Sequence, residues 1–157
     1  MEQLMSEYIK RMHIALELPA MKEVPKLAAA MQLAWKNKKT IYLCGNGGSA
    51  GNANHLANDI GYENIYSEQL RVKADAGDIL VVFSGSGNSA NVVNALEMGN
   101  KLGMETFAVL GYSGGKCKGI AKHPIHFAID DMQIAEDLQL IIFHMAMQWL
   151  CEQGPAK

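Results

Sequence analysis

The sequence is poor in the features that mark exported and membrane proteins. No apolar run reaches the eighteen or more residues that a membrane-spanning helix needs, so no span is expected. Residues 1–18 mix charged with apolar side chains and lack the uninterrupted apolar segment of a signal peptide. The three cysteines, Cys44, Cys117 and Cys151, lie far apart and form no CxxC pair. We therefore expect free thiols and a cytoplasmic location.

An excess of charge of one sign is also lacking. The chain has 14 Lys and Arg against 16 Asp and Glu, which gives a formal net charge of −2. This balance gives no electrostatic reason to expect nucleic acid or a membrane as a partner. Repeats, low-complexity tracts and linkers are absent from the sequence. The 157 residues suit one domain, which we expect over 1–157, with a helical pair over 1–38 and an α/β core over 40–152.

The periodicity of apolar residues predicts two helices followed by alternating strands and helices. Apolar residues recur at helical spacing over 2–18 and again from Met21, with Pro25 near the first turn of the second helix. Short apolar runs of strand length follow at 40–44, 79–83, 106–110 and 125–129. The stretch 89–102, which ends at Gly103, predicts a helix between the second and third runs. Strand, helix and strand in this order predict a parallel sheet that is covered on both faces.

The last helix is predicted to be apolar on two faces. It begins near Asp130 or Asp131, and Asp130 with Gln133 could form a capping box. At about 100° per residue, one face carries Ile134, Leu138, Ile141, Ile142, Met145 and Trp149, and the nearly opposite face carries Leu140, Phe143 and Met147. A helix that is apolar on two faces cannot leave both in water. One face is expected to pack on the sheet and the other on the N-terminal helices or on a second subunit.

Two successive strands each end in a loop that is rich in glycine and serine. The first loop reads GNGGSA over 45–50 and the second SGSGNS over 84–89, and both lead into a helix. Glycine lets backbone N–H groups approach an anion, and a helix N-terminus and serine hydroxyls add further donors. Because the second loop has no Lys or Arg, we expect neutral donors to bind a phosphate. The motifs of a nucleotide P-loop and of a dinucleotide fold are absent, so no nucleotide cofactor is expected.

The alternative is that both loops are ordinary turns of a structural domain that binds nothing specific. Two such loops in succession favour a ligand site, because the carboxyl ends of parallel strands are where α/β sheets bind ligands.

The two loops also carry a resemblance to a known family. GNGGSA followed by a helix, and then FSGSGNSANV, resemble the sugar isomerase (SIS) domain family, especially its phosphoheptose isomerases, across nearly the whole chain. The resemblance implies an α/β three-layer sandwich with a parallel sheet, flavodoxin-like or Rossmann-like, with two N-terminal helices and a long C-terminal helix. It implies aldose–ketose isomerisation of a heptose phosphate, such as sedoheptulose 7-phosphate, through an enediol. It also implies a homo-oligomer, commonly a tetramer.

The resemblance assigns residues to the substrate. Ser84, Ser86 and Ser89 would hold the phosphate, and Asn46 and Ser49 would contact the sugar chain. The full set expected to bind substrate is Asn46, Gly47, Gly48, Ser49, Ser84, Gly85, Ser86, Asn88, Ser89 and Gln133. The last of these stands where the family often has an aspartate.

Four further residues are candidates for acid–base chemistry, which an aldose–ketose isomerase needs at adjacent carbons. His55 and Asp59, at i and i+4, would share one helix face, and Glu136 and His144 lie on the last helix. By resemblance all four positions serve catalysis or zinc binding, with Asp59 and His144 as the catalytic pair. Asp59 replaces a glutamate and Glu136 replaces a glutamine. Without the resemblance, the first pair is equally consistent with a surface ion pair, and His144 with a core histidine.

Spacing on the last helix argues for a site that two subunits share. Glu136 and His144 lie about 12 Å apart along a helix and about 80° apart around it, so one metal would be strained between them. A second subunit would ease this geometry.

One departure from the family pattern is visible after the first loop. Relatives carry an additional helix end, loop and strand before the GYENI stretch, whereas here HLAND runs directly into IGYENI. We therefore expect a four-stranded sheet, or one that is completed unusually. Because that segment supplies part of the sugar-binding wall, its loss bears on catalysis more than on fold. The alternative function is a non-catalytic module that binds phosphosugars and has a regulatory or protein-interaction role.

Overall fold

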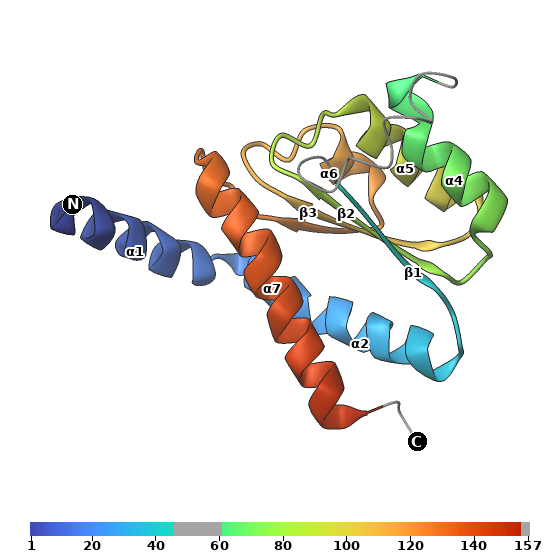
Figure 1. Ribbon diagram of the computed structural model, residues 1–157, viewed down its shortest axis with the longest axis horizontal. Coiled ribbons are helices and arrows are strands. Elements are labelled where there is room, and N and C mark those ends of the chain that lie inside the picture. The colour runs from blue at the N-terminus through green and yellow to red at the C-terminus, as the bar shows by residue number, and fades with distance from the viewer. Residues whose placement is uncertain (46–60, 155–157) are drawn as a thin grey trace.

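The chain folds into a parallel sheet with helices on both faces. The computed structural model describes residues 1–45 and 61–154 (Figure 1). The longer helices are α1 (Glu2–Leu16), α2 (Val24–Lys36), α4 (Ile65–Lys73), α5 (Ala90–Lys101) and α7 (Met132–Gln153). Shorter helical segments are η1 (Pro19–Glu23), η3 (Tyr62–Asn64) and α6 (Cys117–Ile120). Among these residues, no helix combines the length and apolar character needed to cross a bilayer.

The sheet is parallel throughout its described strands. These are β1 (Ile41–Gly45), β2 (Ile79–Ser84), β3 (Glu105–Leu110) and β4 (His123–His126), and they lie side by side in that order. Within the described residues the sheet therefore has the four strands expected from the sequence. Every residue of β2 but one is buried, as expected for a strand covered on both faces.

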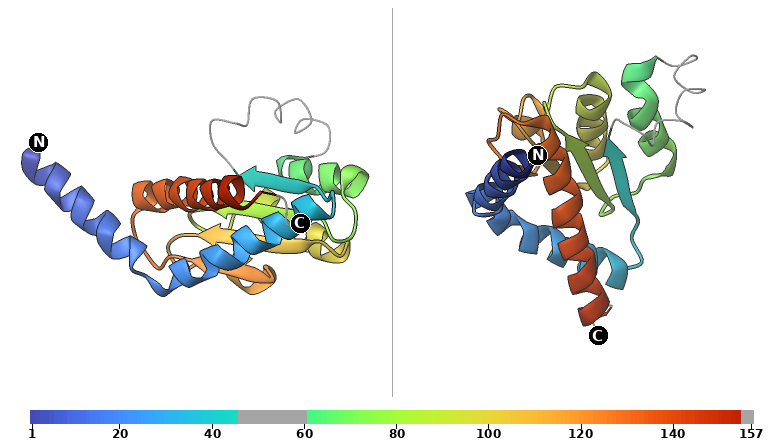
Figure 2. Two further views of the ribbon diagram at one scale, coloured as in Figure 1. Left: turned by 90° about the horizontal axis from the view of Figure 1, so that it is seen from below. Right: turned by 60° about the vertical axis from the view of Figure 1, so that its left-hand side comes forward.

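Alternation along the strands divides the core into two layers. Val81, Phe107 and Ile125 point to one face, where they pack with buried residues of α2 and α7. Leu80 and Ala108 point to the other face, where they pack with residues of α4 and α5. Figures 1 and 2 show α2 and α7 on one side of the sheet and α4 and α5 on the other. This arrangement confirms the predicted three-layer α/β sandwich.

Several predicted element boundaries are wrong by two or more residues. The first helix ends at Leu16, because Leu18 is extended and precedes Pro19 of η1. The last strand spans 123–126 rather than 125–129, because the chain leaves the sheet in a tight turn in which the N–H of Ile129 bonds to the Phe127 carbonyl at 2.8 Å. The apolar run continues past the end of this strand because Phe127, in the turn, is buried.

Helix α7 is capped by a different residue from the one predicted. The Asp131 side chain accepts a hydrogen bond from the Ile134 N–H at 3.2 Å, so Asp131 is the N-cap, and the predicted box of Asp130 with Gln133 is wrong. The cap carboxylate also pairs with Arg11 of α1. It thus ties the N-terminal helix to the start of α7.

Replacing Asp131 by alanine should lower the free energy of unfolding by about 0.5–2 kcal/mol, because the first turn of α7 loses its side-chain acceptor. Asp130→Ala is the matched control. Asp130 is exposed, and its loss should change stability by no more than about 0.5 kcal/mol. Urea denaturation of both variants measures the difference, and equal losses would contradict the assignment of the cap.

The two apolar faces of α7 have different surroundings. Ile134, Leu138 and Ile142 are fully buried, which confirms one predicted face in its first three turns. Met145 and Trp149 were placed on the same face but are exposed, which corrects that prediction. The 22-residue helix extends beyond the sheet, so its C-terminal part contacts α2 rather than a strand (Figure 1).

The second face of α7 is open in the described chain. Leu140 is 58% exposed and Met147 is 41% exposed, although Phe143 packs edge to face on Phe83 at 5.9 Å between ring centroids. The N-terminal helices therefore do not cover this face.

Candidate functional site

The loop between β2 and α5, residues 84–89, will be called the serine loop. Ser84 ends β2 and is buried, Ser86 is exposed, and Ser89 is the N-cap residue of α5. The Ser84 Oγ accepts a hydrogen bond from the Gly87 N–H at 3.0 Å, and the Ser86 Oγ accepts one from the Asn88 N–H at 3.3 Å. Two of the predicted phosphate ligands thus also hold the shape of the loop.

These hydrogen bonds leave the loop able to bind an anion. A serine hydroxyl that accepts one hydrogen bond still has its own O–H to donate. Helix α5 begins directly after the loop, so the positive end of its dipole lies beside the loop. The loop itself contains no cation. The geometry therefore suits a phosphate that is held by neutral donors, as predicted.

The first turn of α7 packs directly on the serine loop. A Cβ added at Gly85 would lie 2.4 Å from the Met132 Sδ, so a larger residue at this position would force the Met132 side chain to move. Gln133, a predicted substrate ligand, is the next residue and is exposed. The structure thus brings the start of α7 beside the loop, although the two are some 45 residues apart along the chain, a separation that only tertiary packing can close.

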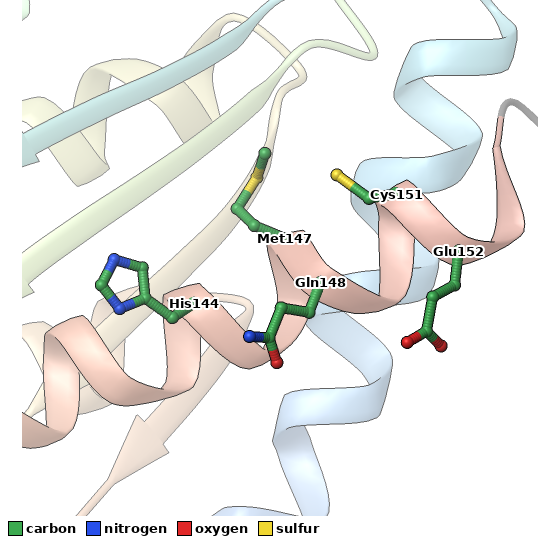
Figure 3. Close-up of a pocket in the computed structure, with 5 residues that line it drawn as sticks. All are labelled: His144, Met147, Gln148, Cys151 and Glu152. Atoms are coloured by element: carbon green, nitrogen blue, oxygen red, sulfur yellow. The ribbon is translucent and has the colours of Figure 1, made fainter.

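Further along α7, His144 lies on the surface. Together with Met147, Gln148, Cys151 and Glu152 it lines an open groove of about 740 Å³ (Figure 3). All five of these side chains belong to one helix. Glu136, two turns earlier, is exposed as well. His144 is therefore not a buried core histidine, which removes that alternative.

The end of β1, where the first glycine-rich loop begins, is held by Tyr66 of α4. Its hydroxyl donates to the Gly45 carbonyl oxygen.

Two of the three thiols have a raised pKa because they are buried. The pKa is about 12 for Cys44, beside Gly45, and about 11 for Cys117. Both thiols stay protonated near neutral pH and are unsuited to act as nucleophiles.

Comparison with known proteins decides the family. A family model described as SIS domain matches residues 6–66 and 57–111. The chain belongs to the SIS domain family. This SIS domain is 33% identical to the phosphoheptose isomerase of Geotalea daltonii, over 77% of this chain and 80% of the relative. It is 29% identical to the phosphoheptose isomerase of Akkermansia muciniphila, over 92% of this chain and 95% of the relative.

Solved structures agree with this fold. The phosphoheptose isomerase GmhA from Neisseria gonorrhoeae matches the SIS domain with a TM-score of 0.86 at 24% identity, over 96% of this chain and 98% of that chain. A phosphoheptose isomerase from Francisella tularensis matches with a TM-score of 0.82 at 20% identity, over 92% and 94%. The likeness confirms the predicted fold class.

The alignments also show that this SIS domain lacks residues that its relatives have. The alignment with the Geotalea daltonii protein extends over 154 positions but covers only 77% of this 157-residue chain, so it must contain gaps in this chain. The two matches to the family model overlap at 57–66, beside the point where HLAND runs into IGYENI. Both observations agree with the segment that the sequence comparison found missing.

A metal centre is not built from the described side chains alone. Within residues 1–45 and 61–154, no three His, Cys, Asp or Glu side chains come together to hold a metal ion. Glu136 and His144 offer donors that suit zinc, but they stand eight residues apart on one helix. The other two predicted ligands, His55 and Asp59, lie outside the described residues, as do Asn46, Gly47, Gly48 and Ser49.

The loop after β3 also lies at the site, although little in its local sequence predicts which segment it contacts. The loop after β3 contacts the serine loop through backbone atoms of Gly111, Lys116 and Cys117. The only local signal was the pair Gly114 and Gly115, which follows a buried strand. Such a pair marks a turn but does not say which segment approaches it.

Proposed function

We propose that this chain is a phosphosugar isomerase of the phosphoheptose isomerase type, an aldose–ketose isomerase acting on a heptose phosphate such as sedoheptulose 7-phosphate. The single observation that carries the proposal is the 33% identity to a phosphoheptose isomerase over 80% of that relative. The serine loop supports it, because it presents three hydroxyls and a helix N-terminus without a cation.

The proposed reaction moves protons between two adjacent carbons. A base removes a proton from C1 of the ketose while the C2 carbonyl oxygen gains one, which gives the enediol. A proton is then delivered to C2 as the O1 hydroxyl loses its proton, which gives the aldose. We assign these transfers to Asp59 and His144, one as base and the other as acid. Ser84, Ser86 and Ser89 hold the phosphate and so fix the distance of the reacting carbons from it.

A homo-oligomer, most simply a tetramer, is part of the proposal. His144 and the exposed Leu140 and Met147 share the outer side of α7, and α1 projects away from the sheet (Figure 2). This helix exposes large apolar side chains, namely Leu4, Met5, Ile9 and Ile14. Exposed apolar surface on two helices supports contact with further copies. All described residues that line the groove beside His144 belong to α7, and a second copy would supply its other side.

We propose zinc as the metal and His55, Asp59, Glu136 and His144 as its ligands, from one subunit or from two. Imidazole and carboxylate donors are those that Zn²⁺ takes in catalytic sites. The three free thiols support the proposed cytoplasmic location.

The deciding experiment is to incubate the protein with sedoheptulose 7-phosphate and to follow both sugars by NMR. The reaction is run as purified, after treatment with EDTA, and with added Zn²⁺. We expect the aldose to appear, with activity lost in EDTA and restored by Zn²⁺. If EDTA leaves the activity unchanged, the proposed zinc is rejected and the proposed isomerase activity is not.

Absence of product in all three arms would reject the isomerase. The melting temperature then separates the remaining functions. Ligand at a hundredfold excess over its Kd stabilises a protein by about 2.7 kcal/mol, which is a readable shift. A shift without product would identify a non-catalytic phosphosugar-binding module, and the lack of any shift would identify a structural domain.

A further inference from the structure

The loop after β3, residues 111–116, runs beside the serine loop and will be called the brace loop. The two loops start at the same level because Ser84, the last residue of β2, pairs with Leu110, the last residue of β3. The chain then leaves both strands at the same edge of the sheet. Close contact between the loops is thus a consequence of strand register.

Three backbone N–H groups donate to the serine loop, two from the brace loop and one from Cys117 at the start of α6. The Gly111 N–H bonds to the Gly85 carbonyl oxygen at 3.0 Å, and the Cys117 N–H bonds to the Gly87 carbonyl oxygen at 3.0 Å. Between them, the Lys116 N–H bonds to the Asn88 Oδ1 at 3.1 Å. These bonds hold Gly85, Gly87 and Asn88 of the serine loop from one side.

The contact is too close for any side chain. A Cβ added at Gly115 would lie 2.6 Å from the Gly87 carbonyl carbon and oxygen and 2.6 Å from the Ser86 carbonyl oxygen. A Cβ added at Gly87 would lie 2.0 Å from the Gly114 carbonyl oxygen. Gly87 and Gly115 also have φ of 68° and 51°, which a residue with a side chain rarely adopts. Backbone therefore meets backbone at this point.

The brace loop is itself fixed to the opposite side. The Tyr112 N–H bonds to the Ile129 carbonyl oxygen at 3.0 Å, and the His126 Nε2 lies 2.8 Å from the Tyr112 carbonyl oxygen. Tyr112 has φ of 43°, an uncommon value for a residue that is not glycine. Such backbone persists only where the surroundings hold it in place. The brace loop thus links the serine loop to β4 and the turn after it.

We propose that the brace loop positions the serine loop for phosphate, with Gly115 as the positioning residue. Ser86 is exposed and the loop has no cation, so binding depends on how well its hydroxyls and amides converge on one point. A displaced Ser86–Gly87 peptide would weaken phosphate binding and leave the proposed acid–base groups, Asp59 and His144, in place. The inference rests on the proposed function only in taking the ligand to be a sugar phosphate.

The test replaces Gly115 by alanine and measures KM and kcat for sedoheptulose 7-phosphate, with Kd from calorimetry. We expect KM and Kd to rise by about tenfold or more, while kcat at saturation stays within about threefold, because the lost contact is made equally before and during reaction. Gly119→Ala is the matched control. Gly119 lies four residues on in α6, and no described atom lies within 4 Å of an added Cβ there.

A second variant covers the outcome in which Gly115→Ala fails to fold, which its melting curve would show. Lys116 has φ of −65°, the value that a proline ring imposes, so Lys116→Pro keeps its own φ and removes the N–H that bonds to Asn88. Its KM and Kd are compared with those of Lys116→Ala, which lacks the same ammonium group but keeps the N–H. A higher KM for the proline variant supports the inference.

Unchanged KM and Kd in both folded variants would overturn the inference. If the wild-type protein binds the sugar phosphate without turnover, the proposed isomerase fails, and Kd alone decides the role of the brace loop. If the wild-type protein does not bind it at all, the serine loop is not a phosphate site and both proposals fall.

Discussion

Replacing His144 by glutamine should lower kcat for sedoheptulose 7-phosphate by about 10²–10⁴-fold, the usual contribution of one general acid or base. Glutamine keeps a polar side chain of similar size but cannot take up or release a proton. Because His144 is exposed on α7, the free energy of unfolding should change by no more than about 0.5 kcal/mol. Loss of activity without loss of stability would place His144 in the chemistry.

The matched control is Gln148→Ala, one turn further along the same groove. It removes a polar side chain beside His144 but no titratable group, and kcat should stay within about threefold of the wild-type value. Steady-state kinetics with thermal denaturation measures both effects. A kcat for His144→Gln equal to that of the control would remove His144 from the mechanism and leave Asp59 to be tested alone.

The second large effect is expected in the core. Leu138→Ala should lower the free energy of unfolding by about 2–5 kcal/mol, because Leu138 is fully buried between α7 and the sheet and its loss leaves a cavity. That is a large part of the 5–15 kcal/mol that stabilises a typical domain. Chemical denaturation at low protein concentration gives the value.

Leu140→Ala distinguishes the two faces of the same helix. Leu140 is 58% exposed, so its loss should change the stability of the isolated chain by no more than about 0.5 kcal/mol. If the open face of α7 contacts a second copy, the same change should shift the protein toward smaller species in sedimentation. Equal losses of stability for the two variants at low concentration would contradict the burial pattern.

Some features of this protein could be predicted from short stretches of sequence because their causes are local. Apolar runs such as 79–83 predict strands buried on both faces, and alternation of strand and helix predicts a parallel sheet. The serine loop was found in the same way, since glycine and serine after a strand point to an anion site. The family followed from this loop together with GNGGSA at 45–50.

Helix ends and helix faces were predicted less well. Asp130 and Asp131 are adjacent and chemically identical, so the sequence could not tell which of them accepts the hydrogen bond from the first turn of α7. Met145 and Trp149 continue the apolar stripe of α7 but lie where the helix has passed the sheet and has less to pack against. Periodicity predicts the direction in which a side chain leaves the helix, whereas its burial depends on whether another element lies in that direction.

The sequence by itself determined the layered α/β fold, the four strands of the described residues and the serine loop, because apolar runs and turn residues are local patterns. Motifs along the chain determined its membership of the SIS domain family. Only the tertiary structure decided that Gly115 lies against Gly87 and that Met132 lies over Gly85. These contacts join segments about 30 and 50 residues apart, and they depend on the register of β2 with β3 and on the path of α7 across the sheet. No local preference encodes such distances.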